Sequence, residues 1–286
     1  MSDPRFERPT TTQHACALLA ETPARAMILA GGTDLQLKLK DGLVNPGIVV
    51  DIKGIRELST ISWSADGELR IGAAVTMRQL CEDTRVVERY PGLAKGAESV
   101  GSYQVRCRAT VGGNLCNASP CMDTAPALLV LGAHLNVNSL KGERDIPLEG
   151  FFAGVKKTTL NPGELCTAIV VPASRQKVRT AYGKIKRVRG HDLALVNCCV
   201  GLDFDQGTLR AAIGSCGPTP VLTQPLTGIH PREADVNELG NELAALALDV
   251  VKPIDDVRAS AEYRRDMAAY LCHRLVGELL GGRKSP

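Results

Sequence analysis

Two pairs of consecutive glycines are the features of this chain best suited to binding a charged ligand. One pair lies in Ala-Gly-Gly-Thr-Asp at residues 30–34, the first diglycine segment, and the other in Thr-Val-Gly-Gly-Asn at residues 110–114, the second diglycine segment. Paired glycines let the backbone approach a ligand closely, so that consecutive N–H groups point at phosphate oxygens. Each segment follows a short apolar run, as a turn after a strand would. Two such turns predict a ligand with two phosphates.

The commoner phosphate-binding motifs are absent from the sequence. No Gly-x-Gly-x-x-Gly follows a strand candidate, which argues against a Rossmann domain, and no Gly-x-x-x-x-Gly-Lys-Ser/Thr occurs, which argues against a P-loop. No histidine or carboxylate cluster has the spacing of a metal site, and the isolated His134 and His273 are typical of packing or surface positions. The two segments therefore indicate a cradle of another type.

The composition is that of a globular protein large enough for two domains. The chain has 286 residues, 44% of them hydrophobic, and its 34 basic and 31 acidic side chains leave a net charge of +3. This charge is too small for a nucleic-acid-binding face, and the basic run at residues 184–189 is typical of a solvated surface. No apolar stretch is long enough to cross a bilayer, and residues 1–10 lack the core of a secretory signal. We expect a cytoplasmic protein whose ten cysteines are reduced thiols.

The first diglycine segment lies within an alternation of helix and strand. Apolar residues at helical spacing predict a helix at residues 12–21, and a short strand at residues 26–29 leads into the segment. A helix-forming stretch with alternate leucines follows and ends at Gly42, and residues 48–51 form a second buried strand.

The second diglycine segment lies in a larger unit of hairpins and helices. Alternating apolar residues predict hairpins over residues 60–71 and 135–146 and a strand at residues 165–171. Helical spacing predicts helices at residues 77–81, 94–100 and 123–131.

The polar segment at residues 172–177 is the predicted domain boundary. The pattern after it predicts three strands and then two helices, at residues 180–188, 193–204, 209–215, 236–248 and 257–280. This order is typical of an α+β domain, in which an antiparallel sheet carries helices on one face.

The residues around the two segments resemble those of a known family. Residues 28–35 read Ile-Leu-Ala-Gly-Gly-Thr-Asp-Leu, and residues 109–120 read Ala-Thr-Val-Gly-Gly-Asn-Leu-Cys-Asn-Ala-Ser-Pro, with Asp123 shortly after. This pattern is similar to the FAD-binding medium subunit of molybdenum hydroxylases, a group that includes xanthine dehydrogenase, carbon monoxide dehydrogenase and 4-hydroxybenzoyl-CoA reductase. Further matches follow in order at residues 70–73, 97–100, 181–184 and 192–197. The resemblance covers nearly the whole chain.

The resemblance implies an α+β fold with two domains. Residues 1–175 would form an FAD-binding domain of the PCMH type, which is vanillyl-alcohol-oxidase-like, with subdomains at about residues 1–58 and 59–175. Residues 176–286 would form a C-terminal domain with a three-stranded antiparallel sheet and helices.

The resemblance also implies which residues hold FAD. The first diglycine segment would wrap the pyrophosphate with its amides, and the second would press against the other side of the cofactor while Thr110 and Asn114 supply polar contacts. Asp123 would accept hydrogen bonds from ribityl hydroxyls, although an aspartate here also suits the cap of a helix. The implied set is Ile28, Leu29, Ala30, Gly31, Gly32, Thr33, Asp34, Leu35, Val100, Thr110, Val111, Gly112, Gly113, Asn114, Ser119, Asp123 and Lys184.

Lys184 is implied to lie near the flavin ring, where a cation stabilises the negative charge of the reduced ring. In a strand with alternating faces, Lys186 and Tyr182 would share its face and Arg187 would not. Which of Lys184, Lys186 or Tyr182 lies nearest the ring stays open, and packing is an equally good role for Tyr182.

The cysteines do not match the one branch of the family that binds a further cluster. The 4-hydroxybenzoyl-CoA reductase subunit carries a cysteine-bearing insert with a four-iron cluster, whereas residues 119–123 here run directly into the predicted helix. Cys116 and Cys121 have no second pair nearby, so we expect no iron–sulfur cluster in this chain. Cys198 and Cys199 lie in an apolar strand, which is typical of inert thiols.

The resemblance implies an electron-transfer subunit with no catalytic residue of its own. Its partners would be a small subunit with two [2Fe-2S] clusters and a large subunit with the molybdopterin-type molybdenum cofactor, in a dimer of heterotrimers. FAD would deliver electrons to NAD or another acceptor. Two alternatives stay open: a stand-alone FAD reductase of the UDP-N-acetylenolpyruvylglucosamine reductase type, and an adaptor subunit without a cofactor.

Overall fold

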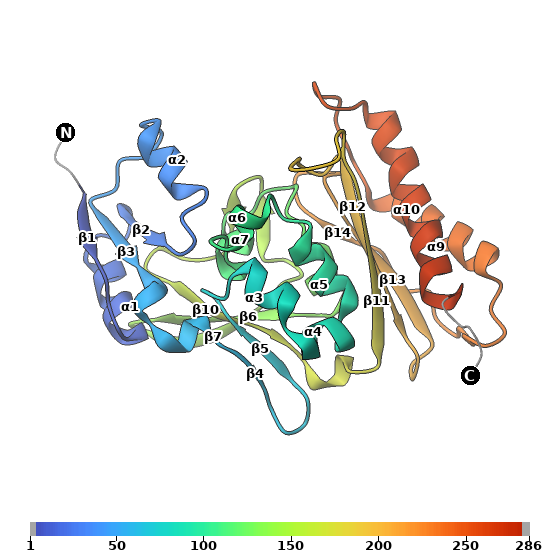
Figure 1. The fold of residues 1–286 in the computed structure, drawn as a ribbon, viewed down its shortest axis with the longest axis horizontal. Helices are drawn as coiled ribbons and strands as arrows, with labels where there is room; N and C mark the ends of the chain where they lie inside the picture. The colour runs from blue at the N-terminus through green and yellow to red at the C-terminus, as the bar shows by residue number, and fades with distance from the viewer. Residues whose placement is uncertain (1–3, 282–286) are drawn as a thin grey trace.

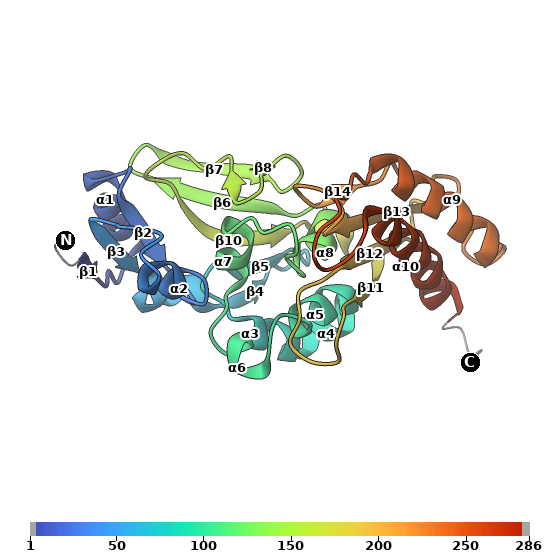
Figure 2. The same cartoon turned by 90° about the horizontal axis from the view of Figure 1, so that it is seen from above.

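Three main sheets follow one another along the longest axis of the molecule (Figures 1 and 2). The computed structural model describes residues 4–281. A small N-terminal sheet lies at one end, a five-stranded sheet lies in the middle, and a C-terminal sheet with two long helices lies at the other end. Each of the three regions has its own cluster of buried apolar side chains.

The N-terminal sheet is parallel, with the strand order β1-β3-β2. All four residues of β3 are buried, as expected for a strand covered on both faces. The helix α1 contacts β2 and β3 and also the strands β6 and β10 of the middle sheet. The elements are β1 (Arg5–Glu7), α1 (Thr12–Glu21), β2 (Ala26–Leu29), α2 (Leu35–Lys40), β3 (Ile48–Asp51) and the 3-10 helices η1 (Ile52–Gly54) and η2 (Arg56–Ser59).

The middle sheet is antiparallel, with the order β4-β5-β10-β6-β7, and every residue of its central strand β10 is buried. Its strands are β4 (Ile61–Trp63), β5 (Leu69–Gly72), β6 (His134–Ser139), β7 (Gly142–Pro147) and β10 (Leu165–Val171), and β8 (Phe152–Gly154) and β9 (Lys157–Thr158) form a separate ribbon. The accompanying helices are α3 (Met77–Glu82), α4 (Thr84–Arg89), α5 (Pro91–Glu98), α6 (Tyr103–Arg106), α7 (Val111–Cys116), α8 (Ala125–Val130) and the 3-10 helix η3 (Ala173–Arg175).

The C-terminal sheet lies between helices from two parts of the chain. It contains β11 (Val178–Ile185), β12 (Val196–Asp203), β13 (Thr208–Gly214) and β14 (Val221–Leu222), which pair antiparallel in that order. The helices α9 (Val236–Val250) and α10 (Ala261–Gly281) pack on this sheet, and α5 and α8 of the middle region also contact it. The C-terminal domain is thereby joined to the helices that follow and precede the second diglycine segment.

The C-terminal sheet has four strands, so the predicted three-stranded sheet is wrong in its strand number. The fourth strand, β14, pairs through only two residues, too few to give an alternating sequence pattern. The predicted strand at residues 180–188 ends at Ile185, and the predicted strand at residues 193–204 begins at Val196. Residues 186–195 form a loop instead, whose first residues are exposed and mostly basic.

Candidate functional site

The two diglycine segments lie against each other. A Cβ atom at Gly31 would overlap the backbone carbonyl oxygen of Arg108, two residues before the second segment. A Cβ atom at Gly113 would lie 3.7 Å from the Cβ of Ala30. The close approach of the two backbones is possible because Gly31 has no side chain, whereas a Cβ at Gly113 would make only an ordinary contact with Ala30.

The first diglycine segment leaves its backbone amides free. Within the described residues, none of the amides of residues 31–34 donates a hydrogen bond, and the Thr33 hydroxyl also has no partner. These residues are partly exposed, and Gly32 has φ +79°, a conformation that disfavours any side chain. Four available N–H groups and a hydroxyl form a donor set suited to phosphate oxygens.

Lys53 holds the first segment from the adjoining strand end. Its Nζ atom donates to the carbonyl oxygen of Ala30 at 3.0 Å and lies 2.6 Å from Oδ1 of the buried Asp51, at the end of β3. Nothing in the sequence pattern singles out Lys53, because a lysine after a buried strand is ordinary. Its contact with Ala30 depends on how the parallel strands are arranged.

The second diglycine segment is the first turn of a helix, so the predicted turn with free amides is wrong here. Thr110 is the N-cap of α7, and its Oγ1 accepts from the Gly113 amide at 3.1 Å. The Val111 and Gly112 amides donate to the carbonyls of Val75 and Ala73 at 3.0 and 3.1 Å. The Asn114 amide donates to the Thr110 carbonyl at 2.9 Å. All four amides of residues 111–114 therefore have partners inside the protein.

Polar side chains around α7 still face the first segment. The Asn117 Nδ2 donates to Oδ1 of Asp34 at 2.8 Å, and the Lys156 Nζ lies 3.8 Å from the same oxygen. Burial lowers the pKa of Lys156, and the nearby charge of Asp34 opposes this shift. The Oδ1 of Asn114 accepts from Thr124 at 2.9 Å, and its Nδ2 donates to no other described residue. Asn114 therefore keeps a donor for a ligand.

Asp123 lies at the centre of a buried polar cluster. Its Oδ1 accepts from the Tyr182 hydroxyl at 2.8 Å and from Nδ2 of Asn197 at 3.0 Å. Its Oδ2 lies 2.8 Å from Nζ of Lys184, and the side chains of this ion pair are each only 7% exposed. Burial, followed by the charge of Asp123, raises the pKa of Tyr182 well above its usual range, so that its hydroxyl remains a proton donor.

The alternative role of Asp123 as a helix cap does not hold. The helix α8 begins at Ala125, its N-cap position is Thr124, and no described side chain caps it. Asp123 is instead bound by three side chains of the C-terminal sheet, which lie about sixty or more residues later in the sequence.

The predicted alternation along the strand is confirmed for Lys184 and Tyr182, which share a face. It is wrong for Lys186, which was predicted to share that face. The first two lie on one face of β11 and both contact Asp123. Lys186 lies beyond the end of this strand, is exposed, and donates to the Gly190 carbonyl at 2.7 Å. Lys184 also donates to the Ser99 carbonyl at 3.1 Å, beside the predicted Val100.

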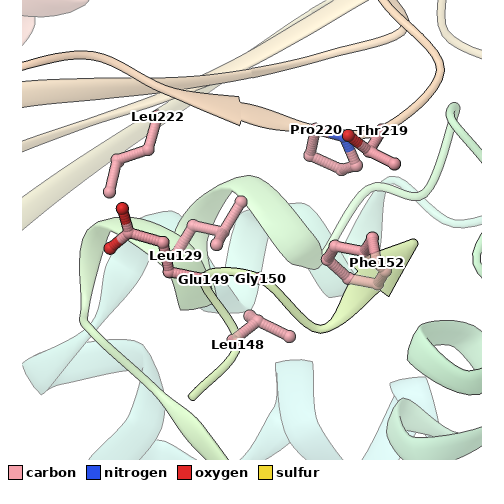
Figure 3. A pocket seen from close by; sticks show the side chains of 8 residues that line it. All are labelled: Leu129, Leu148, Glu149, Gly150, Phe152, Thr219, Pro220 and Leu222. Atoms are coloured by element: carbon pink, nitrogen blue, oxygen red, sulfur yellow. The ribbon is translucent and has the colours of Figure 1, made fainter. Parts of the chain in front are cut away.

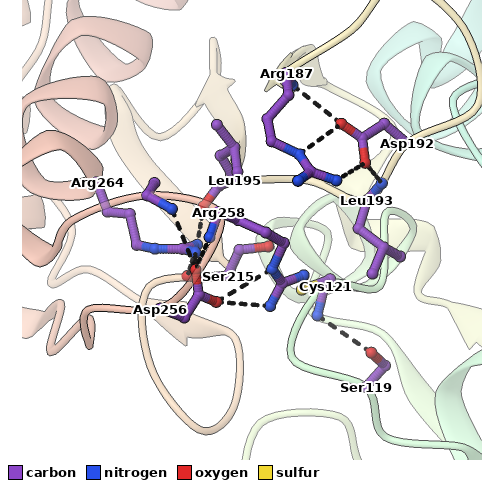
Figure 4. Close-up of polar contacts among 11 residues, drawn as sticks. Ser119, Cys121, Arg187, Asp192, Leu193, Leu195, Ser215, Asp256, Arg258 and Arg264 are labelled. Atoms are coloured by element: carbon purple, nitrogen blue, oxygen red, sulfur yellow. Dashed lines mark hydrogen bonds and ion pairs between the residues drawn. The ribbon is translucent and has the colours of Figure 1, made fainter.

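Ser119, a predicted FAD-binding residue, and the exposed loop after β11 make polar contacts of their own. The Ser119 Oγ accepts from the Cys121 amide at 3.4 Å, and Arg187 pairs with Asp192 at 3.3 Å (Figure 4). Asn197 belongs to the segment singled out from the sequence, but its contact with Asp123 could not be foreseen because it depends on the packing of β12 against the middle region.

The buried cysteines have the surroundings of inert thiols, as predicted for Cys198 and Cys199. Both are fully buried, and burial raises the pKa of Cys199. The neighbouring Cys272 thiol, together with burial, raises the pKa of Cys198. Within residues 4–281 no group of three or more His, Cys, Asp or Glu side chains could hold a metal ion.

A separate small cavity lies away from both segments. Figure 3 shows it between α8, the start of β8 and β14, and its lining includes Leu129, Phe152 and Leu222 together with the carboxylate of Glu149. None of the predicted FAD-binding residues lines this cavity.

None of the described helices combines the length and the apolar character needed to span a bilayer.

Two family models cover most of the chain. Residues 2–174 match the FAD binding domain in molybdopterin dehydrogenase, and residues 180–279 match the CO dehydrogenase flavoprotein C-terminal domain. The xanthine dehydrogenase FAD-binding subunit of Escherichia coli O157:H7 is 32% identical over 282 residues, covering 96% of this chain and 94% of that protein. The carbon monoxide dehydrogenase medium chain of Hydrogenophaga pseudoflava is 31% identical over 281 residues, covering 96% and 97%.

Solved structures share the whole fold. A carbon monoxide dehydrogenase chain from Hydrogenophaga pseudoflava superposes with a TM-score of 0.88 at 29% identity, covering 96% of each chain. A chain of quinoline 2-oxidoreductase from Pseudomonas putida 86 superposes with a TM-score of 0.87 at 27% identity, covering 99% of each chain.

Proposed function

The chain belongs to the family of FAD-binding medium subunits of molybdopterin dehydrogenases, and on this premise we propose that it binds one FAD and carries electrons between the iron–sulfur clusters of a partner subunit and an external acceptor such as NAD. The single observation that carries the proposal is the set of free amides at residues 31–34. A flavin cofactor supplies the capacity to take up and release electrons, and the protein contributes binding, orientation and electrostatics.

We assign the pyrophosphate of FAD to the first diglycine segment. Its four free amides and the Thr33 hydroxyl can donate to phosphate oxygens, and the lack of room for a Cβ at Gly31 keeps the backbone itself at the surface of the cradle. The second segment contributes close packing and the free Nδ2 of Asn114, not backbone amides.

We assign the ribityl chain and the ring edge to Asp123 and Lys184. An ionised carboxylate offers about four acceptor positions, and three donors already occupy Asp123, which leaves one position for a ribityl hydroxyl. An ammonium group has three protons, and Lys184 uses two of them on Asp123 and the Ser99 carbonyl. Each partner of this ion pair can therefore make one further hydrogen bond.

We propose the assembly that the resemblance implies. A small subunit with two [2Fe-2S] clusters and a large subunit with the molybdenum cofactor would join this chain in a cytoplasmic dimer of heterotrimers. In support, relatives with more than nine-tenths coverage are named as subunits or medium chains of larger dehydrogenases. The stand-alone reductase would require turnover by the single chain.

The test is the flavin content of the purified full chain, alone and co-expressed with its neighbouring subunits. We expect flavin absorbance and about one FAD per chain, retained or regained when free FAD is added. A folded chain that stays colourless and does not rebind FAD would exclude the proposed function and favour the adaptor alternative.

A further inference from the structure

The segment between α7 and α8 is held by the C-terminal domain along four consecutive residues. The Ser215 amide donates to the Pro120 carbonyl at 2.9 Å, and the Arg258 guanidinium lies 3.9 Å from the Cys121 sulfur. The Met122 carbonyl and the Asp123 carboxylate both accept from Asn197. Figure 4 shows Arg258 between Asp256 and Cys121. The C-terminal domain thus positions the segment that carries Asp123.

Asn197 makes the most specific of these contacts. Its side chain is fully buried, and its Nδ2 donates to the Met122 carbonyl at 3.1 Å and to Oδ1 of Asp123 at 3.0 Å. Its own Oδ1 has no hydrogen-bond partner in the structure, and a Cβ at Gly214 would overlap this oxygen. An unpaired buried carbonyl destabilises a fold, so packing alone does not account for an amide at this position.

We infer that Asn197 is a positioning residue for the FAD site. Its two donated hydrogen bonds fix the backbone of Met122 and the rotation of the Asp123 carboxylate, so that Oδ2 faces Lys184. The inference rests on the proposed function, because it gives the Asp123–Lys184 pair its place beside the flavin. The C-terminal domain thereby sets both the affinity for FAD and the charge arrangement at the ring.

The test compares Asn197→Asp with the wild-type full chain. The substitution keeps the shape of the side chain but places an acceptor against two other acceptors, the Asp123 carboxylate and the Met122 carbonyl. We expect the dissociation constant for FAD to rise about tenfold to a hundredfold. We also expect a lower midpoint potential for the remaining flavin at alkaline pH, where both carboxyls are ionised and the added negative charge disfavours the reduced ring, and a smaller shift at lower pH, where Asp123 and the new carboxyl share one proton.

Asp203→Asn is the matched control on the same strand. Asp203 is also buried, but its Oδ1 accepts from the Asp205 and Gln206 amides in the turn after β12, away from Asp123. We expect this variant to keep the wild-type affinity and potential. Equal losses of FAD in the two variants would assign the effect to general destabilisation and overturn the positioning role.

A double-mutant cycle with Gly214 keeps the inference testable if Asn197→Asp does not fold. Gly214→Ala should displace the Asn197 side chain and weaken FAD binding, whereas in an Asn197→Ala background the new methyl group meets no amide oxygen and should add little further loss. Additive losses would overturn the inference. A folded wild-type chain without FAD would instead refute the proposed function.

Discussion

The two diglycine segments have similar sequences but use their backbone amides in opposite ways. No described residue accepts a hydrogen bond from the amides of residues 31–34. The amides of residues 111–114 all have partners inside the protein, namely both oxygens of Thr110 and the backbone after β5. The difference comes from the residue that begins each segment. Thr110 is a good N-cap and starts a helix, but Ala30 offers no side-chain oxygen. A glycine pair alone therefore does not identify a phosphate cradle.

The two segments have different roles at the proposed site. The first segment supplies donors, and the second supplies a rigid surface against which the first is packed, together with Asn114 and Asn117.

The largest effect is expected from Gly31→Ala. The new Cβ would overlap the Arg108 carbonyl, so the first segment must move away from the second, and overpacking of this kind costs about 1–3 kcal/mol. We expect the affinity for FAD, measured by fluorescence titration, to fall by about a hundredfold. Gly47→Ala is the control, because its Cβ would make only ordinary contacts with Arg25, the closest at 3.6 Å. Full affinity in Gly31→Ala would remove the first segment from the site.

Hydrogen exchange compares the amides of the two segments directly. Residues 31–34 should exchange fast without FAD and about tenfold or more slower with it, because no described residue accepts from these amides and the proposed pyrophosphate would. Residues 111–114 should be protected in both states. The measurement is mass spectrometry of peptides that cover each segment after the flavin is removed and then restored. Equal protection of residues 31–34 in both states would contradict the pyrophosphate assignment.

Two Thr→Val substitutions should have intermediate effects, one on the affinity for FAD and the other on the stability of the fold. Thr33→Val removes a hydroxyl without an internal partner, so we expect unchanged thermal stability and about tenfold weaker FAD binding. Thr110→Val removes the cap of α7, so we expect a loss of about 1 kcal/mol in the free energy of unfolding with a smaller change in affinity. Thermal melts with and without FAD measure both. A loss of stability in Thr33→Val and a loss of FAD affinity in Thr110→Val would mean that the second segment, not the first, binds the cofactor.

Much of the fold follows from local patterns. The strands at residues 26–29, 48–51 and 165–171 and the helix at residues 12–21 are confirmed with their predicted bounds, because each has an apolar pattern of one clear period. β1 was not predicted, since Phe6 is its only apolar residue and is 58% exposed. α7 was not predicted either, because two glycines disfavour a helix and only packing and the Thr110 cap offset this preference.

The site was predictable where alternation along one strand sufficed. Tyr182 and Lys184 share a face of β11, and that part of the prediction is confirmed by their contacts with one carboxylate. Partners that are distant in sequence were not predictable. Lys53 reaches Ala30 because β2 and β3 pair in one sheet, and Asn197 reaches Met122 because β12 packs against the middle region. Nothing in the local sequence specifies those distances.

A small effect is expected from Asn117→Ala, which tests whether the second segment supports the first through side chains. The hydrogen bond from Asn117 to Asp34 at 2.8 Å is exposed, and a hydrogen bond contributes about 0.5–1.5 kcal/mol to stability. We expect FAD affinity to fall about threefold, since Asp34 remains near Lys156. Lys156→Met should change it still less, because the exposed ion pair at 3.8 Å is weak. If Asn117→Ala weakens FAD binding as much as Gly31→Ala does, the side chains of the second segment determine the conformation of the first. That result would contradict the view that the first segment alone provides the donors and the second only supports it.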